Sequence, residues 1–152
     1  MLVPGTPAID FTLKDQNNEE FTLSGHRGSK AVLVVFYPFA FTGICTGELN
    51  AIRDDPAFFS SDSVTTVTVS CDSGYAQKIF AERERFAFPL LSDFWPHGAV
   101  ARAYGVFSES TGVALRGTFL VDGAGIVRFS ERNGLGQGRD PQGWRDAIAA
   151  LD

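Results

Sequence analysis

Continuous and alternating runs of apolar residues predict short strands connected by helices. Residues 31–36 are six apolar residues in succession, which is typical of a strand buried on both faces of a sheet. Residues 64–70 are rich in Val and Thr and predict a second strand, and residues 88–91 predict a third. Helices are expected between and after these strands, over residues 47–53, 75–85 (capped by Asp72 or Ser73) and 96–104 (with Pro96 in its first turn).

The two ends of the chain add hairpins and a last helix. Residues 10–13 and 20–23 are strand-like runs on either side of a turn that contains Asn and Asp. Residues 117–122 and 126–131 are separated by a Gly-Ala-Gly turn, and residues 144–151 predict a closing helix. This order predicts a single α/β domain over residues 1–152, with a central mixed β-sheet flanked by helices and an N-terminal β-hairpin.

Composition and charge narrow the classes of function. Of the 152 residues, 44% are hydrophobic and 20% are charged, which is an ordinary globular balance. The net charge of −5 argues against nucleic-acid binding, and the longest apolar run is too short to cross a membrane. His26 and His97 stand apart from other ligand-type residues, so no metal is expected. The glycine-rich residues 134–138 predict a mobile loop, because their spacing does not fit a dinucleotide fingerprint.

The cysteine count and the N-terminus bear on the compartment. Cys45 and Cys71 are the two cysteines of the chain, too few for a disulfide scaffold. The first residues lack the basic start and apolar run of a signal peptide. We therefore expect a cytoplasmic protein.

The most informative segment joins the most buried strand to a helix and reads Pro38-Phe39-Ala40-Phe41-Thr42-Gly43-Ile44-Cys45. Cys45 is expected in the first helical turn, where free backbone N–H groups and the helix dipole stabilise a thiolate. Thr42 can aim its hydroxyl at the sulfur or at an oxygen bound beside it, and Pro38 can wall off one side of the sulfur. The segment predicts an activated cysteine, with a buried structural cysteine as the alternative.

The string Pro-x-x-x-Thr-x-x-Cys resembles the active-site signature of the peroxiredoxin family. Residues 7–13 resemble the N-terminal opening of the family, and residues 116–122 resemble the later strand that brings in an active-site arginine, here Arg116. Residues 88–98 are most similar to the actinobacterial one-cysteine type, the alkyl hydroperoxide reductase E type. The resemblance implies a thioredoxin-like fold.

The same resemblance implies catalytic roles for Cys45, Thr42, Pro38 and Arg116. Cys45 would be the peroxidatic nucleophile, and Arg116 would be a fixed cation that reaches both sulfur and oxygen. From sequence alone, a surface salt bridge is the alternative for Arg116. Backbone N–H groups of supporting residues, among them Gly43 and Ile44, would supply further donors.

Glu48 and three aromatic residues have expected roles that the sequence leaves open. In the family, an acid at the position of Glu48 often orients the arginine, and the alternative is a solvated helix residue. Phe39, Phe41 and Trp95 could line a pocket mouth that accepts an organic chain, or could be core or dimer-contact residues. The habit of the family and the 14 phenylalanines predict a homodimer or a higher homo-oligomer.

The implied function is a thiol-dependent peroxidase that serves antioxidant defence without cofactor or metal. It would reduce hydrogen peroxide, organic hydroperoxides and peroxynitrite through a Cys45 sulfenic acid. An external thiol would recycle the enzyme, either mycothiol with a mycoredoxin or a thioredoxin. The alternative function is a redox sensor or interaction module that uses Cys45 as a switch.

Cys71 does not occupy a place where two-cysteine members of the family carry their resolving cysteine. Asn50 occupies one such place. We therefore expect Cys71 to be a structural thiol, with a Cys45–Cys71 disulfide as the alternative.

Overall fold

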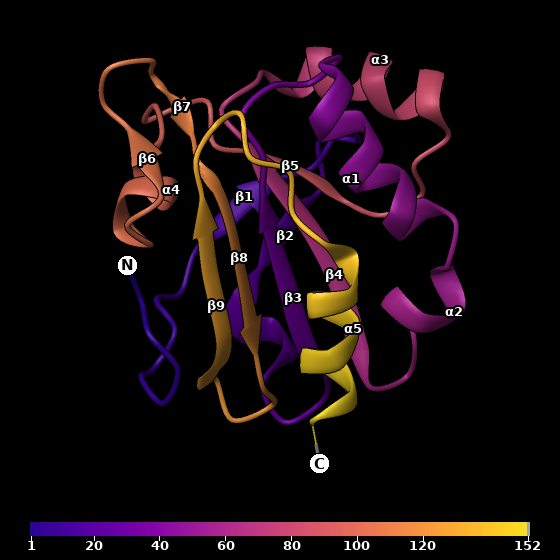
Figure 1. The fold of residues 1–152 in the computed structure, drawn as a ribbon, viewed down its shortest axis with the longest axis vertical. Helices are drawn as coiled ribbons and strands as arrows, with labels where there is room; N and C mark the ends of the chain where they lie inside the picture. The colour runs from indigo at the N-terminus through magenta and orange to yellow at the C-terminus, as the bar shows by residue number, and fades with distance from the viewer. Residues whose placement is uncertain (152) are drawn as a thin grey trace.

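The computed structural model describes residues 1–151, and its centre is a seven-stranded sheet in the order β2-β1-β5-β4-β3-β8-β9 (Figure 1). The strands of this sheet are β1 (Thr12–Lys14), β2 (Glu20–Thr22), β3 (Ala31–Phe36), β4 (Val64–Ser70), β5 (Leu90–Ser92), β8 (Arg116–Val121) and β9 (Val127–Asn133). A separate two-stranded sheet pairs β6 (Phe107–Ser108) with β7 (Val113–Ala114). The helices are the 3₁₀ turn η1 (Leu23–His26) and the α-helices α1 (Gly43–Arg53), α2 (Pro56–Phe59), α3 (Gly74–Glu84), α4 (Ala99–Ala103) and α5 (Pro141–Ala149).

The sheet is mixed, with β3 near its middle. Strands β3, β4 and β5 run parallel to one another, whereas β8 pairs with β3, and β1 with β5, in the antiparallel sense. All six residues of β3 are buried, as the continuous apolar run predicts. Because β3 lies between β4 and β8, the loop that follows β3 emerges beside the end of β4 and the beginning of β8.

Helices cover both faces of the sheet. Alternate residues of β3 point to opposite faces, so that Leu33 and Val35 belong to one core and Val32 and Val34 to the other. The first core is completed by α1, α2, α3 and α5, and the second by α4 with β7 (Figure 1). The predicted fold class, a mixed sheet flanked by helices with an N-terminal hairpin β1–β2, is confirmed.

Three helix starts differ from the sequence prediction, and one of them is that of α5, which begins at Pro141 instead of residue 144. Helix α1 begins at Gly43 instead of residue 47, and therefore includes Cys45. Helix α4 begins only at Ala99, because Gly98 has a positive φ of 70° that ends any helix approaching from residue 96. For α3, Ser73 is the cap, and its side chain accepts a hydrogen bond from the N–H of Ala76.

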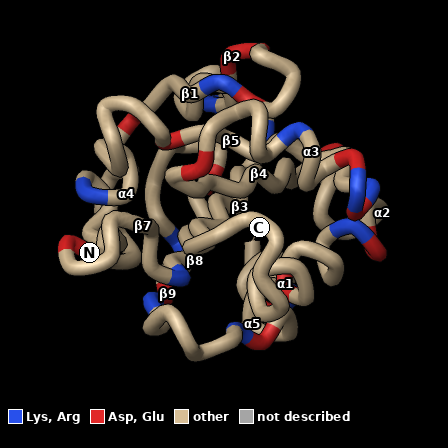
Figure 2. Tube along the Cα trace, turned by 90° about the horizontal axis from the view of Figure 1, so that it is seen from above, with Lys and Arg blue, Asp and Glu red and all other residues tan. Residues whose placement is uncertain are grey.

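Charged residues of both signs are spread over the hairpin and over α3 (Figure 2). Lys14 lies opposite Glu20 in the hairpin, and Lys78 forms an i,i+4 ion pair with Glu82 on α3. Within residues 1–151, no helix is long and apolar enough to cross a bilayer.

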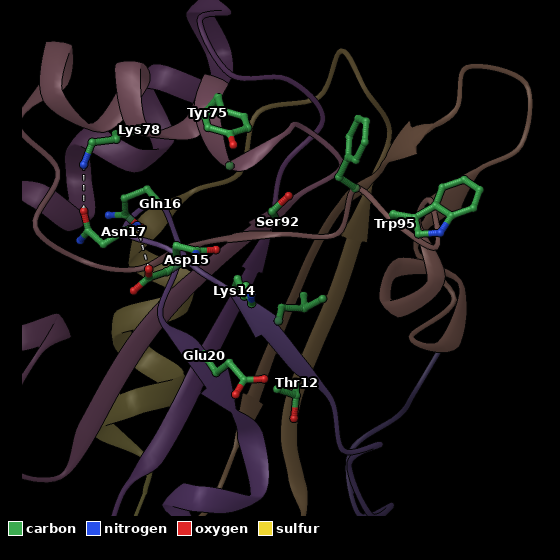
Figure 3. Close-up of a pocket in the computed structure, with 14 residues that line it drawn as sticks. Thr12, Lys14, Asp15, Gln16, Asn17, Glu20, Tyr75, Lys78, Ser92 and Trp95 are labelled. Carbon is green, nitrogen blue, oxygen red and sulfur yellow. Dashed lines mark hydrogen bonds between the residues drawn. The ribbon is translucent and has the colours of Figure 1, made fainter.

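A pocket of about 720 Å³ lies between the hairpin and the beginning of α3 (Figure 3). Tyr75 and Trp95 contribute exposed aromatic rings to it. Cys45, Thr42 and Arg116 are not among its lining residues. The residues expected to form the active site therefore lie in a different part of the molecule.

Candidate active site

Cys45 is the third residue of α1 and is fully buried. Thr42, the residue before the first residue of α1, is the N-cap of this helix and has an extended backbone at φ −97° and ψ 151°. The first N–H groups of a helix have no intrahelical acceptor, so the sulfur lies where the backbone offers donors and positive potential. The strand-to-helix junction thus places Cys45 at the anion-favouring end of α1.

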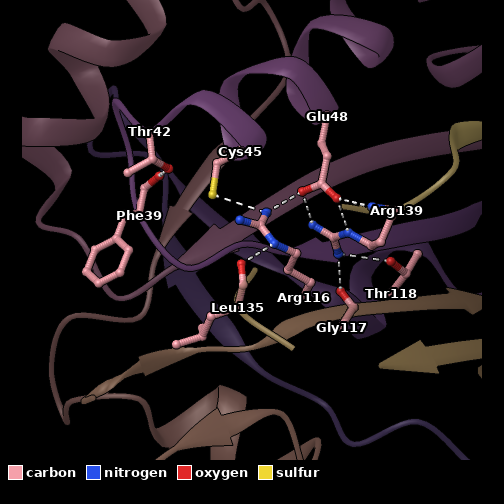
Figure 4. A network of polar contacts seen from close by, with 9 residues as sticks. All are labelled: Phe39, Thr42, Cys45, Glu48, Arg116, Gly117, Thr118, Leu135 and Arg139. Atoms are coloured by element: carbon pink, nitrogen blue, oxygen red, sulfur yellow. Dashed lines mark hydrogen bonds and ion pairs between the residues drawn. The ribbon is translucent and has the colours of Figure 1, made fainter. Parts of the chain in front are cut away.

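Arg116 is the first residue of β8, and its side chain reaches the sulfur from the sheet (Figure 4). The pairing of Val35 with Thr118 brings the beginning of β8 to the end of β3, where the loop toward Cys45 leaves the sheet. Nη1 of Arg116 donates to Sγ of Cys45 at 3.3 Å, and its Nε donates to the carbonyl oxygen of Leu135 at 2.9 Å. Arg116 is 3% exposed, so solvent screens this contact little.

Glu48 joins Arg116 to a second arginine, Arg139. Oε1 of Glu48 accepts from Nη1 of Arg116 at 2.6 Å and from Nη2 of Arg139 at 2.9 Å. Its Oε2 accepts from Nε and from the backbone N–H of Arg139, at 2.9 Å and 2.8 Å. Arg139 also donates from Nη1 to the carbonyl oxygen of Gly117 and to Oγ1 of Thr118. Glu48 is therefore a buried bridge and not a solvated helix residue (Figure 4).

The protonation of Glu48 follows from this bridge. Burial alone would raise the pKa of its carboxyl, but the hydrogen bonds and charge of Arg139, with the charge of Arg116, outweigh burial. The net effect holds the pKa of Glu48 below its usual range. Glu48 is thus an anion at neutral pH, and it fixes both guanidinium groups.

A second pocket, of about 270 Å³, is lined by Arg116 and by residues that precede Cys45, but not by Cys45 itself. It is lined by residues of the loop, of the first turn of α1 and of the arginine site, namely Pro38, Phe39, Thr42, Gly43, Ile44, Arg116 and Leu135. No atom of residues 1–151 accepts a hydrogen bond from Nη2 of Arg116. A small molecule in this pocket can therefore meet a guanidinium N–H that the protein does not use.

Other expected site residues are arranged differently from the sequence hypotheses. The hydroxyl of Thr42 donates to the carbonyl oxygen of Phe39 at 2.9 Å, and not to the sulfur. Phe39 lines the pocket beside Cys45, whereas Phe41 packs against Phe80 and Trp95 lines the larger, separate pocket. Phe39, Phe41 and Trp95 are all exposed, which excludes the core alternative for each of them.

Arg139 and Leu135 are parts of the site that sequence reasoning missed. Both belong to the connection between β9 and α5, part of which was expected to be a mobile glycine-rich loop. Instead, the connection delivers a carbonyl oxygen to Arg116 and a guanidinium to Glu48. Arg139 is 91 residues from Glu48 in sequence, so no local pattern could have revealed their pairing.

Cys71 is a free thiol on the other side of the sheet from Cys45. It directly follows β4 and lies close to Asp93, whose carboxylate caps α4, and to Ala114 of β7. Burial, together with the nearby charge of Asp93, raises the pKa of the Cys71 thiol to about 12. Residues 1–151 contain no group of three His, Cys, Asp or Glu side chains arranged to hold a metal ion.

A thiol at a helix start beside a strand-borne arginine, in a mixed sheet flanked by helices, is the arrangement that the resemblance to the peroxiredoxins implies. The model of the AhpC/TSA family matches residues 4–130. The chain is 54% identical over 151 residues to alkyl hydroperoxide reductase E of Mycobacterium tuberculosis, covering 99% of each chain.

Solved structures show the same likeness. The peroxidoxin BcpB of Mycobacterium tuberculosis superposes with a TM-score of 0.88 at 30% identity, covering 100% of this chain and 99% of that one. The reduced 2-Cys peroxiredoxin of Plasmodium vivax also gives a TM-score of 0.88, at 27% identity, covering 99% of this chain and 82% of that one. The chain therefore belongs to the AhpC/TSA family and is a peroxiredoxin enzyme with a thioredoxin-like fold.

Proposed function

We propose that this peroxiredoxin reduces peroxides through Cys45 and that an external thiol regenerates it. The observation that carries the proposal is the contact of 3.3 Å between Sγ of Cys45 and Nη1 of Arg116, at the beginning of α1. The cluster around this contact holds two arginines against one carboxylate. One positive charge is left over in this cluster, next to the sulfur.

The proposed reaction begins with attack of the Cys45 thiolate on the terminal oxygen of the peroxide. An S–O bond forms while the O–O bond breaks, so the sulfur is oxidised to a sulfenic acid and the peroxide is reduced. The leaving oxygen departs with the electron pair and takes up a proton, which gives water or an alcohol. Arg116 is suited to this step because Nη2 is free to donate where negative charge develops on oxygen.

The pocket beside Cys45 supports a substrate range of hydrogen peroxide, organic hydroperoxides and peroxynitrite. Its polar side is Arg116, which suits a peroxide or an anion, and its apolar side is formed by Phe39, Ile44 and Leu135. Phe39 and Ile44 are exposed, so an organic chain can lie along them and extend into solvent. Pro38 is the rigid wall of this pocket, and Gly43 borders it where α1 begins.

The one-cysteine cycle is the form of recycling that we propose. One external thiol condenses with the sulfenic acid to a mixed disulfide and water, and a second thiol releases Cys45 as a thiol and leaves as the external disulfide. The burial of Cys71 on the opposite face supports an external reductant over a Cys45–Cys71 bridge. Mycothiol with a mycoredoxin, or a thioredoxin, is the proposed source of these thiols, and the cytoplasm is the proposed compartment.

Peroxide consumption with a supplied thiol reductant tests the proposal. We expect Cys45→Ser to abolish turnover and the matched variant Cys71→Ser to retain it, because only Cys45 contacts Arg116. Many turnovers per protein chain in the wild type would exclude the redox-sensor alternative. Undiminished consumption by Cys45→Ser would overturn the proposal.

A further inference from the structure

The loop that precedes Cys45 is held by a carboxylate from a neighbouring strand. The backbone N–H of Ala40 donates to Oδ2 of Asp72 at 3.0 Å. Asp72 lies just beyond the end of β4, next to the end of β3 from which the loop starts. This hydrogen bond joins residues 38–42 to the sheet at a point close to the reactive cysteine.

Asp72 is itself fixed by buried polar groups. Its Oδ2 accepts a second hydrogen bond, at 2.8 Å, from the hydroxyl of Ser70. That hydroxyl oxygen accepts in turn from Nε2 of Gln77 on α3 at 3.0 Å, and Gln77 also donates to the carbonyl oxygen of Leu91. Ser70 and Gln77 are both completely buried, so the carboxylate has little freedom to move away from the loop.

The loop has a conformation that needs such support. Phe41, the neighbour of Ala40, has a positive φ of 69°, which is uncommon for a bulky residue and costs free energy. Its ring packs on Phe80 with centroids 5.2 Å apart, and the guanidinium of Arg83 lies 5.3 Å from its centroid. Contacts on both sides of the Ala40–Phe41 bond therefore hold a strained backbone in place.

We propose that Asp72 is a positioning residue that keeps the loop closed, with Cys45 buried beside Arg116. A peroxide is small enough to enter the pocket that Arg116 and the residues before Cys45 line, and only a small local movement separates this pocket from the sulfur. A larger thiol reagent must reach a sulfur that has no exposed surface, so it requires the loop or the first turn of α1 to open. The hydrogen bond from Ala40 to Asp72 biases the protein toward the closed, peroxide-reactive state. This inference rests on the proposed role of Cys45.

The test compares reactions that need the closed and the open loop. In Asp72→Ala, labelling of Cys45 by a bulky maleimide should rise about tenfold, the order expected for loss of one hydrogen bond to a charged group. The rate of Cys45 oxidation by hydrogen peroxide should fall in the same variant, because fewer molecules are closed. Asp72→Asn keeps an oxygen that can accept from Ala40 and should restore most of the wild-type behaviour.

General unfolding is assessed by urea unfolding of the variant, because Cys71 directly precedes Asp72, whose charge helps to raise the pKa of the Cys71 thiol. Site-resolved mass spectrometry under conditions where the variant is folded should find faster labelling at Cys45. Asp122→Ala is the matched control variant. Asp122 also accepts backbone hydrogen bonds in a turn, but this turn follows the last residue of β8, whereas Arg116 is the first residue of that strand. Asp122→Ala should change neither the maleimide labelling rate nor the peroxide oxidation rate of Cys45.

The outcomes separate this inference from the proposed function. If Asp72→Ala labels Cys45 at the wild-type rate, or if labelling of Cys45 rises only where urea unfolding shows the variant to be unfolded, the positioning role is wrong, while the requirement for Cys45 in turnover is untouched. If Asp72→Ala does not fold, Ser70→Ala, which removes the hydroxyl that supports Asp72, gives the same test with a smaller expected effect.

Discussion

Glu48 shows how one residue can set the charge of the whole site. Its single carboxylate bridges two guanidinium groups, and all three side chains are almost completely buried. The bridge fixes the orientation of Arg116 toward Cys45 and leaves one positive charge beside the sulfur. Removal of the carboxylate would leave two buried cations without a counterion.

We therefore predict that Glu48→Gln lowers the free energy of unfolding by about 3–5 kcal/mol at neutral pH. The lowered pKa of Glu48 means that folding favours the ionised carboxylate. The stability that ionised Glu48 contributes is therefore fully present above the ordinary glutamate pKa of 4.5, and it is lost as the pH falls through the lower pKa of the folded state. Urea unfolding of both proteins across the acidic range should show their stabilities converging as the pH falls. A difference that is independent of pH would contradict this account of Glu48.

Strand β3 and helix α1 illustrate how far the pattern of apolar residues and motifs in the sequence predicts the site. The apolar run of β3 and the Thr-x-x-Cys spacing at the beginning of α1 were sufficient to locate Cys45 beside a sheet end. The pattern could not reveal the connection between β9 and α5 as part of the site, because its contacts with Arg116 and Glu48 are made across the fold. Helix α2 and the strands β6 and β7 were also missed, and each of them has four residues or fewer.

The alternation of faces along β4 gives a prediction for Cys71. Cys71 lies with α4 and β7, away from Cys45, and its thiol has a pKa raised to about 12 by burial and by Asp93. We expect Cys71 to resist iodoacetamide near neutral pH in the folded protein and to be labelled once the protein is unfolded in urea. Equal labelling of Cys71 in the folded and unfolded states, measured by mass spectrometry, would show that this description of its environment is wrong.

The segments that follow the parallel strands β3, β4 and β5, including the first turn of α3, expose several large apolar side chains beyond the carboxyl ends of these strands. These side chains are Phe39, Phe41, Tyr75, Phe94 and Trp95. A concentration of exposed aromatic rings is typical of an interaction surface. We propose that this surface is the contact between two copies of the chain, which would also shield the surroundings of the Cys45 pocket.

At the scale of the whole molecule, we expect the chain to form a homodimer or a higher homo-oligomer, and we expect Trp95 to contribute to the contact between copies. Trp95 is 80% exposed in the single chain, and Trp95→Arg should shift the protein toward monomer because an arginine would be desolvated in the contact. Val3→Arg, at an exposed apolar residue near the N-terminus, is the matched control and should leave assembly unchanged. Sedimentation velocity distinguishes the species, and a wild type that is monomeric at micromolar concentration would refute the proposed contact.

The most direct measurement is mass spectrometry of the protein after one equivalent of hydrogen peroxide in the presence of dimedone, which traps sulfenic acids. Cys45 is the cysteine that contacts Arg116, so we predict a dimedone adduct on Cys45, a free Cys71 and no bridge between them. Cys71→Ser should give the same adduct in the same yield. An adduct on Cys71, or a Cys45–Cys71 disulfide in place of the adduct, would contradict the assignment of Cys45 as the peroxidatic cysteine of a one-cysteine cycle.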